Sequence, residues 1–300
     1  MFERLFAESG LSLDRLRSLL EVGAAGSIVK AAHGDPVRQS QYSRQIKELE
    51  DFFRVKLTER QGKGSRLSPN GKELARISRF FMLGLSNFQR GCQADHQSFR
   101  IGASATFVHQ VLLPAVSKTD AIAGGTRYIT ETIANEEIER RLHDLTLDFG
   151  IITQSIISRP LQLTPLGQWS LKLWVPRSLY RNEKSARRAL QERRLSLAVA
   201  QKEFHWPNLE CFSDSEPAFV CDGFLDAKTV VEQGAAAAIL PECVMPSGKD
   251  GKCFSIRMAE LQAMELQFQL AWNPRLLRLN PHAIRQRDVF RRILLKQMAE

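Results

Sequence analysis

Apolar side chains recur every three or four positions through the first third of the chain, which is the period of an amphipathic helix. The spacing predicts a first helix that begins at Ser12, because serine is a favourable N-terminal cap. A second helix is expected over 28–33, capped by Ser27 and ended by Gly34. The third helix has apolar residues at spacings of four, three and four, namely Tyr42, Ile46, Leu49 and Phe53. That stripe is its buried side, so the polar residues between them face outward.

A glycine-rich basic hairpin follows the third helix. Residues 57–60 and 66–68 predict its two short arms, with Gly62 and Gly64 at the tip. Two helices joined by a turn and followed by such a hairpin form a winged helix-turn-helix, expected here over residues 1–68. The second helix of that arrangement, the recognition helix, can enter a major groove of DNA.

A long linker helix is predicted over residues 69–92. Ser68 and Pro69 give it a capping hydroxyl and a proline at the first helical position. Its apolar stripe consists of Leu74, Ile77, Phe81, Leu85 and Phe88. A small domain offers little surface to bury this stripe, so we expect the helix to pair with a second copy of the chain. The alternative is that it packs on its own winged domain.

From residue 98 onward the pattern changes to alternating strands and helices. Strands are expected at 99–103, 128–133 and 148–152, with helices at 107–116 and 136–145. This alternation predicts a mainly parallel sheet covered by helices.

A second α/β unit begins near Leu171. It includes a strand at 195–200, a helix at 224–233 and an apolar run at 235–240, and the strand 267–272 and helix 281–298 then complete the first unit. The prediction is one domain over 98–300, with subdomain I at 98–170 and 265–300 and subdomain II at 171–264. Two crossing segments would join the subdomains and leave a cleft between them.

Charge separates the two parts of the chain. Residues 1–90 hold 16 Lys and Arg against 10 Asp and Glu, whereas the remaining 210 residues hold 26 against 23. A basic end joined to a nearly neutral one fits a DNA-binding domain followed by a second domain with a different function. The 5 cysteines include no C-x-x-C pair, and neither a leader nor a membrane span is apparent, so we expect a soluble, cytoplasmic protein with reduced thiols.

Several short motifs stand out from this background. In the first part they are Gly26-Ser27, Ala31-Ala32, Gln39, Ser43-Arg44-Gln45-Ile46-Lys47, Leu49-Glu50, Leu57, Arg60 and Leu67-Ser68-Pro69-Asn70-Gly71. In the second part the best anchors are Phe99-Arg100-Ile101-Gly102 and the run 234–241. With these motifs the chain resembles the LysR-type transcriptional regulators along nearly its whole length. The resemblance implies a periplasmic-binding-protein-like effector domain of two α/β subdomains, a small-molecule effector, and assembly as a homodimer or homotetramer.

Three positions depart from the family pattern. Arg38 stands where the family usually has a serine that caps the recognition helix, and Asp35 stands where it has a leucine. Asp35 followed by Pro36 is expected to cap and start that helix slightly early. Thr58 replaces a common phenylalanine, so we expect looser packing under the wing.

The candidate DNA-binding residues lie on the recognition helix and the wing. They are Arg38, Gln39, Ser40, Ser43, Arg44, Lys47, Lys63 and Arg66. Gln39 can pair with an adenine edge and Arg44 with a guanine, so these two are the best base readers. The serines are short enough to bond base or phosphate, while Lys47 and the wing cations are placed to hold phosphates. The alternative is that these residues only solvate an exposed helix.

The candidate effector-binding residues follow the first three strands of the α/β region. They are Ser104, Thr106, Thr132, Asn135 and Thr153. Small ligands gather where the carboxyl ends of parallel strands meet helix N-termini, so a small molecule is expected between the subdomains, with an anion as one candidate. Each of these residues is equally explained as an ordinary helix cap.

The function predicted from these observations is sequence-specific binding of double-stranded promoter DNA, modulated by a small molecule in the cleft, with RNA polymerase as a candidate further partner. No enzymatic activity, metal or cofactor is expected, because no catalytic or nucleotide-binding motif is present and the histidines are not at metal-ligand spacing. Two alternatives stay open. One is an effector-independent DNA-architecture protein, and the other is a redox-responsive regulator that uses Cys211 and Cys221.

Overall fold

The structure is a computed structural model, and it divides the chain into two compact units, Met1–Asp95 and His96–Glu300. Each unit has its own hydrophobic core. The described residues are 3, 5, 10–61, 64–93, 98–118, 126–154, 156–203, 216–245, 251–262, 264–279 and 281–299.

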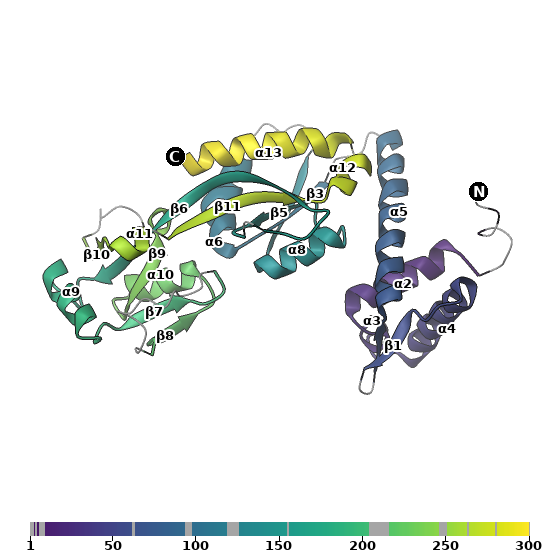
Figure 1. Ribbon diagram of the computed structural model, residues 1–300, viewed down its shortest axis with the longest axis horizontal. Coiled ribbons are helices and arrows are strands. Elements are labelled where there is room, and N and C mark those ends of the chain that lie inside the picture. The colour runs from purple at the N-terminus through teal and green to yellow at the C-terminus, as the bar shows by residue number, and fades with distance from the viewer. Residues whose placement is uncertain are drawn as a thin grey trace. The chain divides into compact units, whose positions relative to one another are not determined.

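The first unit is helical with one hairpin, as the sequence predicts (Figure 1). Its elements are α2 (Leu13–Ala25), α3 (Ile28–Ala31), α4 (Pro36–Phe53), β1 (Thr58–Gln61), β2 (Gly64–Leu67) and α5 (Pro69–Gln93). The helices α2 and α4 pack together around Leu19, Val22 and Leu49, none of which has more than a trace of exposed surface. The winged helix-turn-helix is therefore confirmed.

Local capping fixes where the helices begin. The Ser12 hydroxyl accepts a hydrogen bond from the Arg15 amide at 3.3 Å, so the predicted start of α2 is confirmed. The Asp35 carboxylate accepts from the Val37 amide at 2.8 Å, and Pro36 occupies the first helical position of α4. The early start expected for the recognition helix is confirmed as well.

Two details of the first unit differ from expectation. The helix α3 ends at Ala31 rather than at residue 33, because His33 and Gly34 have φ angles of 51° and 79°, which no right-handed helix tolerates. In the wing, Gly64 lies within β2 rather than at the tip, and Gly62 falls outside the described residues.

The linker helix α5 leaves its apolar stripe uncovered within the single chain. Side chains of Ile77, Phe81, Leu85 and Phe88 are 53, 49, 46 and 74% exposed, whereas Leu74 packs against the winged core. The alternative in which the whole stripe packs on its own winged domain is therefore wrong.

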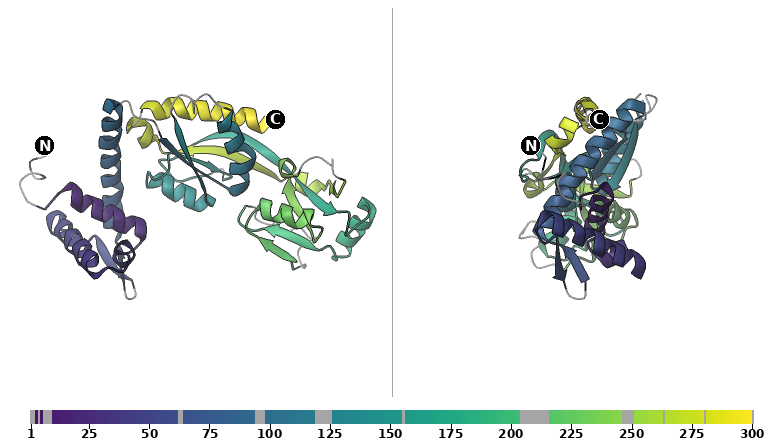
Figure 2. Two further views of the ribbon diagram at one scale, coloured as in Figure 1. Left: turned by 180° about the vertical axis from the view of Figure 1, so that it is seen from behind. Right: turned by 90° about the vertical axis from the view of Figure 1, so that its right-hand side faces the viewer.

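The second unit is an α/β structure with one large sheet (Figures 1 and 2). Its elements are β3 (Ser98–Ala103), α6 (Ala105–Phe107), the π-helical η1 (Val108–Leu112), α7 (Leu113–Ser117), β4 (Arg127–Thr132), α8 (Asn135–His143), β5 (Phe149–Ile152), β6 (Gln162–Pro176), α9 (Glu183–Gln191), β7 (Leu197–Ala200), β8 (Phe219–Cys221), α10 (Phe224–Glu232), β9 (Ala237–Pro241), the 3-10 turn η2 (Glu242–Val244), β10 (Cys253–Ile256), α11 (Ala259–Gln262), β11 (Glu265–Trp272), α12 (Pro274–Leu279) and α13 (Pro281–Ala299).

The three strands that predicted a mainly parallel sheet, now β3, β4 and β5, do pair in parallel, but the sheet as a whole is mixed. Its strand order is β4-β3-β5-β11-β6-β9-β7-β8, with β10 also paired to β6. The pairs that β3 forms with β4 and β5 are parallel, as are the pairs that β7 forms with β8 and β9. All pairs that involve β6 or β11 are antiparallel. Two parallel regions are thus joined through two long antiparallel strands.

The strand β6 belongs to both regions. Its residues up to Ser170 pair with β11, and from Leu171 onward they pair with β9 and then also with β10. We call the region with β3, β4, β5 and β11 lobe I, and the region with β7, β8, β9 and β10 lobe II. The expected change of subdomain between residues 170 and 171 falls at this exchange of partners.

Helices cover the sheet of lobe I on both sides. In Figure 1, α13 runs along β6 and β11, while α8 lies against the opposite face near β5. Phe290 of α13 is fully buried and its ring centroid lies 5.5 Å from that of Phe149 in β5. Lobe II has its own core, in which Phe224 and Ala227 of α10 pack against Leu173 of β6 and its neighbours.

Short elements of the second unit were not foreseen. They are α9, β8, β10, α11 and α12. The helix expected at 107–116 is a helical segment from Ala105 to Ser117 with a π-helical turn inside it, and the helix expected at 136–145 is α8, which ends at His143. No helix within the described ranges is both long and apolar enough to span a bilayer.

Candidate DNA-binding surface and effector pocket

The outward side of α4 carries all of the DNA-binding candidates that the sequence places on this helix. They are Arg38, Gln39, Ser40, Ser43, Arg44 and Lys47, and every one is exposed. The opposite side is held in the core by Ile46 and Leu49, which are 2% and 0% exposed. The helix therefore presents one continuous polar and basic surface, while its apolar stripe fixes which side faces out.

Two arginines on this surface, Arg38 and Arg44, pair with carboxylates three or four residues away along the chain. Arg44 donates from Nε to Oε1 of Glu48 at 3.0 Å, and its side chain is 82% exposed. Arg38 lies 3.9 Å from the Asp35 carboxylate, also in solvent. Exposed pairs of this kind contribute little to stability, so both guanidinium groups can turn to a base or a phosphate at small cost.

Polar contacts between α2 and α4 fix the orientation of the recognition helix. The Arg15 guanidinium of α2 donates to the Glu48 carboxylate, and the Ser18 hydroxyl donates to the side chain of Gln45. The hydrogen bond from Arg15, followed by that from Arg44, lowers the pKa of Glu48. Glu48 is therefore ionised at neutral pH and ties the two helices together.

The wing is anchored to α4 by a buried carboxylate that the sequence analysis did not assign to the site. Glu50 is 8% exposed, and its Oε1 accepts from the amides of Leu57 and Thr58 at 2.8 and 3.0 Å. The Thr58 hydroxyl donates to the same oxygen at 3.1 Å, and Lys56 donates to the other. Burial acts to raise the pKa of Glu50, but the hydrogen bonds from Lys56 and the wing outweigh it and the pKa is lowered.

Thr58, which stands where a phenylalanine is common, thus makes a specific hydrogen bond to Glu50. A phenylalanine in its place would have no hydroxyl to donate to Glu50. Farther along the hairpin, Glu59 and Arg66 are cross-strand neighbours whose side chains pair at 2.8 Å. Arg66 is exposed on the wing, and Lys63 lies outside the described residues.

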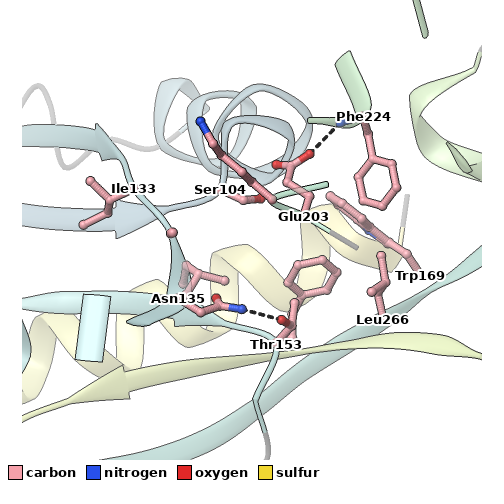
Figure 3. A pocket seen from close by; sticks show the side chains of 12 residues that line it. Ser104, Ile133, Asn135, Thr153, Trp169, Glu203, Phe224 and Leu266 are labelled. Atoms are coloured by element: carbon pink, nitrogen blue, oxygen red, sulfur yellow. Dashed lines mark hydrogen bonds between the residues drawn. The ribbon is translucent and has the colours of Figure 1, made fainter. Parts of the chain in front are cut away.

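A pocket lies at the junction of the two lobes in the second unit (Figure 3). Its enclosed space is about 20 Å³, and the wider hollow of about 390 Å³ around it includes open solvent. It is lined by Ser104, Ile133, Ala134, Asn135, Ile151, Thr153, Trp169, Lys202, Glu203, Phe224, Leu266 and Phe268.

Three of the five predicted effector residues line this pocket. The Asn135 side-chain amide donates to the Thr153 hydroxyl at 2.7 Å, and Ser104 accepts from the Phe107 amide at 3.3 Å as a helix cap. Thr106 is fully buried beside the pocket rather than in its lining. Thr132, the last residue of β4, is exposed and does not line it either.

One wall of the pocket is aromatic. Trp169 and Phe268 belong to the paired strands β6 and β11, and their ring centroids lie 4.4 Å apart in an edge-to-face arrangement. Phe107 stacks on Trp169 from behind, with centroids 5.8 Å apart. Leu266 extends the wall formed by Trp169 and Phe268, and polar side chains line much of the rest of the pocket.

The pocket also contains a carboxylate, Glu203, that the sequence analysis missed. It lies in the turn that follows the end of β7 at Ala200, whereas Ser104 follows β3 directly, so the rule that found the lobe I residues also points to this turn. In Figure 3 its carboxylate points to the Phe224 backbone, apart from the pair formed by Asn135 and Thr153.

Two family models match the chain. Residues 13–72 match the bacterial regulatory helix-turn-helix protein, lysR family, and residues 93–292, two thirds of the chain, match the LysR substrate binding domain. The chain belongs to the LysR family. It is accordingly a DNA-binding transcriptional regulator whose second domain is of the effector-binding type, as its two units and their sites indicate.

Solved full-length LysR-type regulators have the same fold. A full-length OxyR variant from Pseudomonas aeruginosa is 16% identical, with coverage of 95% of this chain and 94% of that one and a TM-score of 0.66. ArgP from Mycobacterium tuberculosis is 18% identical, with coverage of 93% and 96% and a TM-score of 0.66. LysG from Corynebacterium glutamicum, solved with bound effector Arg, is 15% identical, with coverage of 95% and 99% and a TM-score of 0.62.

The described thiols of Cys221, Cys243 and Cys253 all have a raised pKa. Burial, then the carboxylates of Asp226 and Asp222, raises the pKa of Cys221. Burial likewise raises the pKa of Cys253. A raised pKa disfavours the thiolate that oxidants attack. Cys211, the other candidate for redox sensing, lies outside the described residues.

Proposed function

We propose that the outward side of α4 reads base pairs in a major groove and that Gln39 and Arg44 are its principal base-reading side chains. The observation that carries this assignment is the exposed row of polar side chains on a recognition helix whose other side is locked into the core. Ser40 and Ser43 allow close approach of the backbone, while Arg38 and Lys47, with Arg66 and Lys63 of the wing, would hold phosphates. Promoter DNA is the expected duplex.

The effect of Arg44 on discrimination tests this assignment. Arg44→Ala is expected to reduce the preference for the cognate duplex over a variant changed at the contacted guanine by about 1–3 kcal/mol. Duplexes selected by the wild-type protein from a random pool would supply the cognate site, and fluorescence anisotropy at fixed salt would measure both affinities.

Arg17→Ala is the matched control, because Arg17 is an exposed, ion-paired arginine on α2 of the same unit. It is expected to leave discrimination unchanged. If Arg44→Ala and a matching Gln39→Ala both weaken binding to all duplexes equally, this side of α4 holds the backbone only and the assignment of base readers is wrong.

We further propose that two copies of the chain pair through α5, as a homodimer or as half of a homotetramer. The support is the exposed stripe of Ile77, Phe81, Leu85 and Phe88 on a helix that begins at the wing. Pairing would place two recognition helices on a pseudo-palindromic site.

The pocket of the second unit is our candidate for the effector site. Its support is the combination of an aromatic wall with the Asn135 and Thr153 pair at the carboxyl ends of parallel strands. A ligand there would alter the DNA-bound assembly only as far as it binds one arrangement of the lobes more tightly than another. RNA polymerase is proposed as the further partner and the cytoplasm as the place of action, because promoter DNA is there.

A further inference from the structure

The Glu203 carboxylate joins the two lobes through main-chain and side-chain hydrogen bonds. Its Oε1 accepts from the Thr106 amide at 3.0 Å. Its Oε2 accepts from the Thr106 hydroxyl at 2.6 Å and from the Phe224 amide at 2.7 Å. Thr106 belongs to lobe I, whereas Glu203 and Phe224 belong to lobe II. One carboxylate therefore bridges the lobes beside the pocket.

The donors around Glu203 form an anion-binding position. Thr106 lies in the first turn of the helical segment that starts at Ala105, and Phe224 is the first residue of α10. Amides at the starts of helices lack partners within the helix and favour negative charge. The cap residue of α10, Gly223, has no side chain to fill this role, so Glu203 supplies the missing acceptor.

The backbone at Gly223 leaves room for this carboxylate. A Cβ atom built on Gly223 would lie 2.8 Å from Oε2 and 3.2 Å from Cδ of Glu203. The φ angle of Gly223 is −147°, which any residue adopts, so glycine serves here to leave space rather than to permit a special conformation. Thr106, on the other side of the carboxylate, is 0% exposed. The position is thus closely fitted around the Glu203 carboxylate.

The charge of the pocket follows from this arrangement. Among its lining residues the charged groups are Glu203 and Lys202, and the Lys202 ammonium is paired with Asp222. An anionic ligand would meet the Glu203 carboxylate, and the lining cation Lys202 could answer it only by leaving its exposed pair with Asp222. A neutral ligand or one with a hydrogen-bond donor would instead find a carboxylate acceptor, the Asn135 and Thr153 pair, and the aromatic wall.

We propose that Glu203 is an internal ligand of this pocket: its carboxylate fills the anion-binding position between Thr106 and Phe224, holds the lobes together, and restricts the effector to uncharged or cationic molecules. This proposal rests on the proposed effector site, and it deepens that assignment by naming the class of ligand. Removing the Glu203 carboxylate opens a site for a small external carboxylate, whereas the wild-type protein has none.

Chemical rescue of the full-length protein tests the proposal. In the wild type, the amides of Thr106 and Phe224 are expected to be protected from hydrogen exchange, and formate is expected to have no effect on them. In Glu203→Ala, protection of both amides falls by roughly tenfold or more, the loss expected for hydrogen bonds to a charged acceptor. Formate then restores the protection with a saturable dependence, while chloride at equal ionic strength does not.

Three further variants make the result decisive. Glu203→Gln keeps the side-chain volume and serves if Glu203→Ala fails to fold; it is expected to weaken protection at both amides. Glu216→Ala removes an exposed carboxylate of the same lobe and is expected to change nothing. Adding Thr106→Val to Glu203→Ala removes one donor and is expected to weaken the rescue by formate.

Unchanged protection in Glu203→Ala and Glu203→Gln, or saturable protection of the wild-type amides by formate, overturns the proposal. Neither DNA nor a metabolite is present in these measurements. Their outcome therefore does not depend on whether the proposed function is correct. If the internal carboxylate is confirmed but no neutral or cationic metabolite in a screen shifts the melting temperature of the wild type, the proposed effector site fails while the lobe contact stands. The restriction on effector charge fails if an anionic metabolite binds the wild-type pocket.

Discussion

At the scale of single residues, two carboxylates perform similar work in different domains. Glu50 accepts amides from the start of the wing, and Glu203 accepts amides from the starts of two helices. A carboxylate taken out of water is costly unless hydrogen bonds replace its hydration, and both residues meet that condition with main-chain donors. Each therefore fixes a short segment of backbone, and for the buried Glu50 these bonds also compensate for lost hydration.

Glu50→Gln is expected to loosen the wing in a pH-dependent way. The pKa of Glu50 in the folded chain is lowered from its usual value of 4.5, so the ionised side chain stabilises the fold above that value. This stabilisation is lost as the pH falls through the folded pKa. At pH 7 we expect the variant to lower the free energy of wing opening by about 1–3 kcal/mol, measured by hydrogen exchange at the amides of Leu57 and Thr58.

The difference in the free energy of wing opening between Glu50→Gln and the wild type should shrink toward zero in acid, where both side chains are neutral. Glu59→Gln, which changes an exposed carboxylate of the same hairpin, is the control and should have little effect at any pH. A loss of equal size at pH 7 and in acid would show that the charge of Glu50 is not what holds the wing.

The sequence predicted more of the residues on the DNA-binding surface than of those that line the pocket. The exposed side of α4 follows from helical periodicity, so the sequence is enough to place Gln39 and Arg44 on it. It is not enough to place Glu203, because the partners of that carboxylate are 97 and 21 residues away and are reached only after the lobes have folded. Thr132 was misplaced by one residue, since Ile133 and Ala134 enter the lining directly after β4 ends.

At the scale of elements, the wing and the linker helix meet at a tightly packed junction. The Ser68 hydroxyl donates to the Lys56 carbonyl at 2.7 Å and accepts from the Gly71 amide at 3.1 Å. A Cβ atom on Gly71 would lie only 2.1 Å from the Leu57 carbonyl oxygen. The first turn of α5 therefore approaches the wing through a position where only glycine fits.

Gly71→Ala is expected to lower the free energy of unfolding of the first unit by about 1–3 kcal/mol or more, because the backbone of the wing must move to admit a methyl group. Unfolding in urea, followed by hydrogen exchange in α2 and α4, measures the change. Asn70→Ala, at the exposed neighbouring position, is the control. A stability of Gly71→Ala equal to that of Asn70→Ala would mean that the junction is not rigid.

Elements defined by local signals were predictable, and elements defined by distant pairing were not. Ser12, Ser27 and Asp35 cap their helices with donors two or three residues away, so the sequence alone contains the information. The strands β8 and β10 are short, and each exists because a partner strand lies beside it. The antiparallel course of β6 and β11 is likewise a property of the assembled sheet and not of either segment.

At the scale of the whole molecule, the exposed stripe of α5 determines how copies of the chain associate. Phe81→Asp places a charge at the centre of that stripe and is expected to shift the protein from dimer or tetramer toward monomer. Analytical ultracentrifugation without DNA would show a dissociation constant weaker by at least roughly tenfold, because an unpaired charge would be buried at the contact.

Lys72→Asp is the control for this experiment, because it introduces the same residue at an exposed position on the other side of the same helix. It is expected to leave the mass unchanged. An unaltered mass for Phe81→Asp would exclude this stripe as the contact between copies.

The division of the chain into a basic winged end and an α/β region could be predicted from charge and periodicity. The sequence predicted a cleft between the two lobes, because the chain returns to lobe I after it has formed lobe II. It did not predict which residues line the pocket. Its contents, an aromatic wall and an internal carboxylate, depend on side chains contributed by β6, β11 and the turn after β7, and no local pattern unites these segments.

The direct passage of β6 from one lobe into the other limits what the second domain can do when a ligand enters. A strand that is hydrogen-bonded on both sides of Ser170 and Leu171 offers no slack there, unlike a flexible tether. When the lobes move relative to each other, β6 must therefore twist, because both lobes share this strand. We expect effector binding to rotate the lobes by a modest twist about this strand rather than to swing them apart.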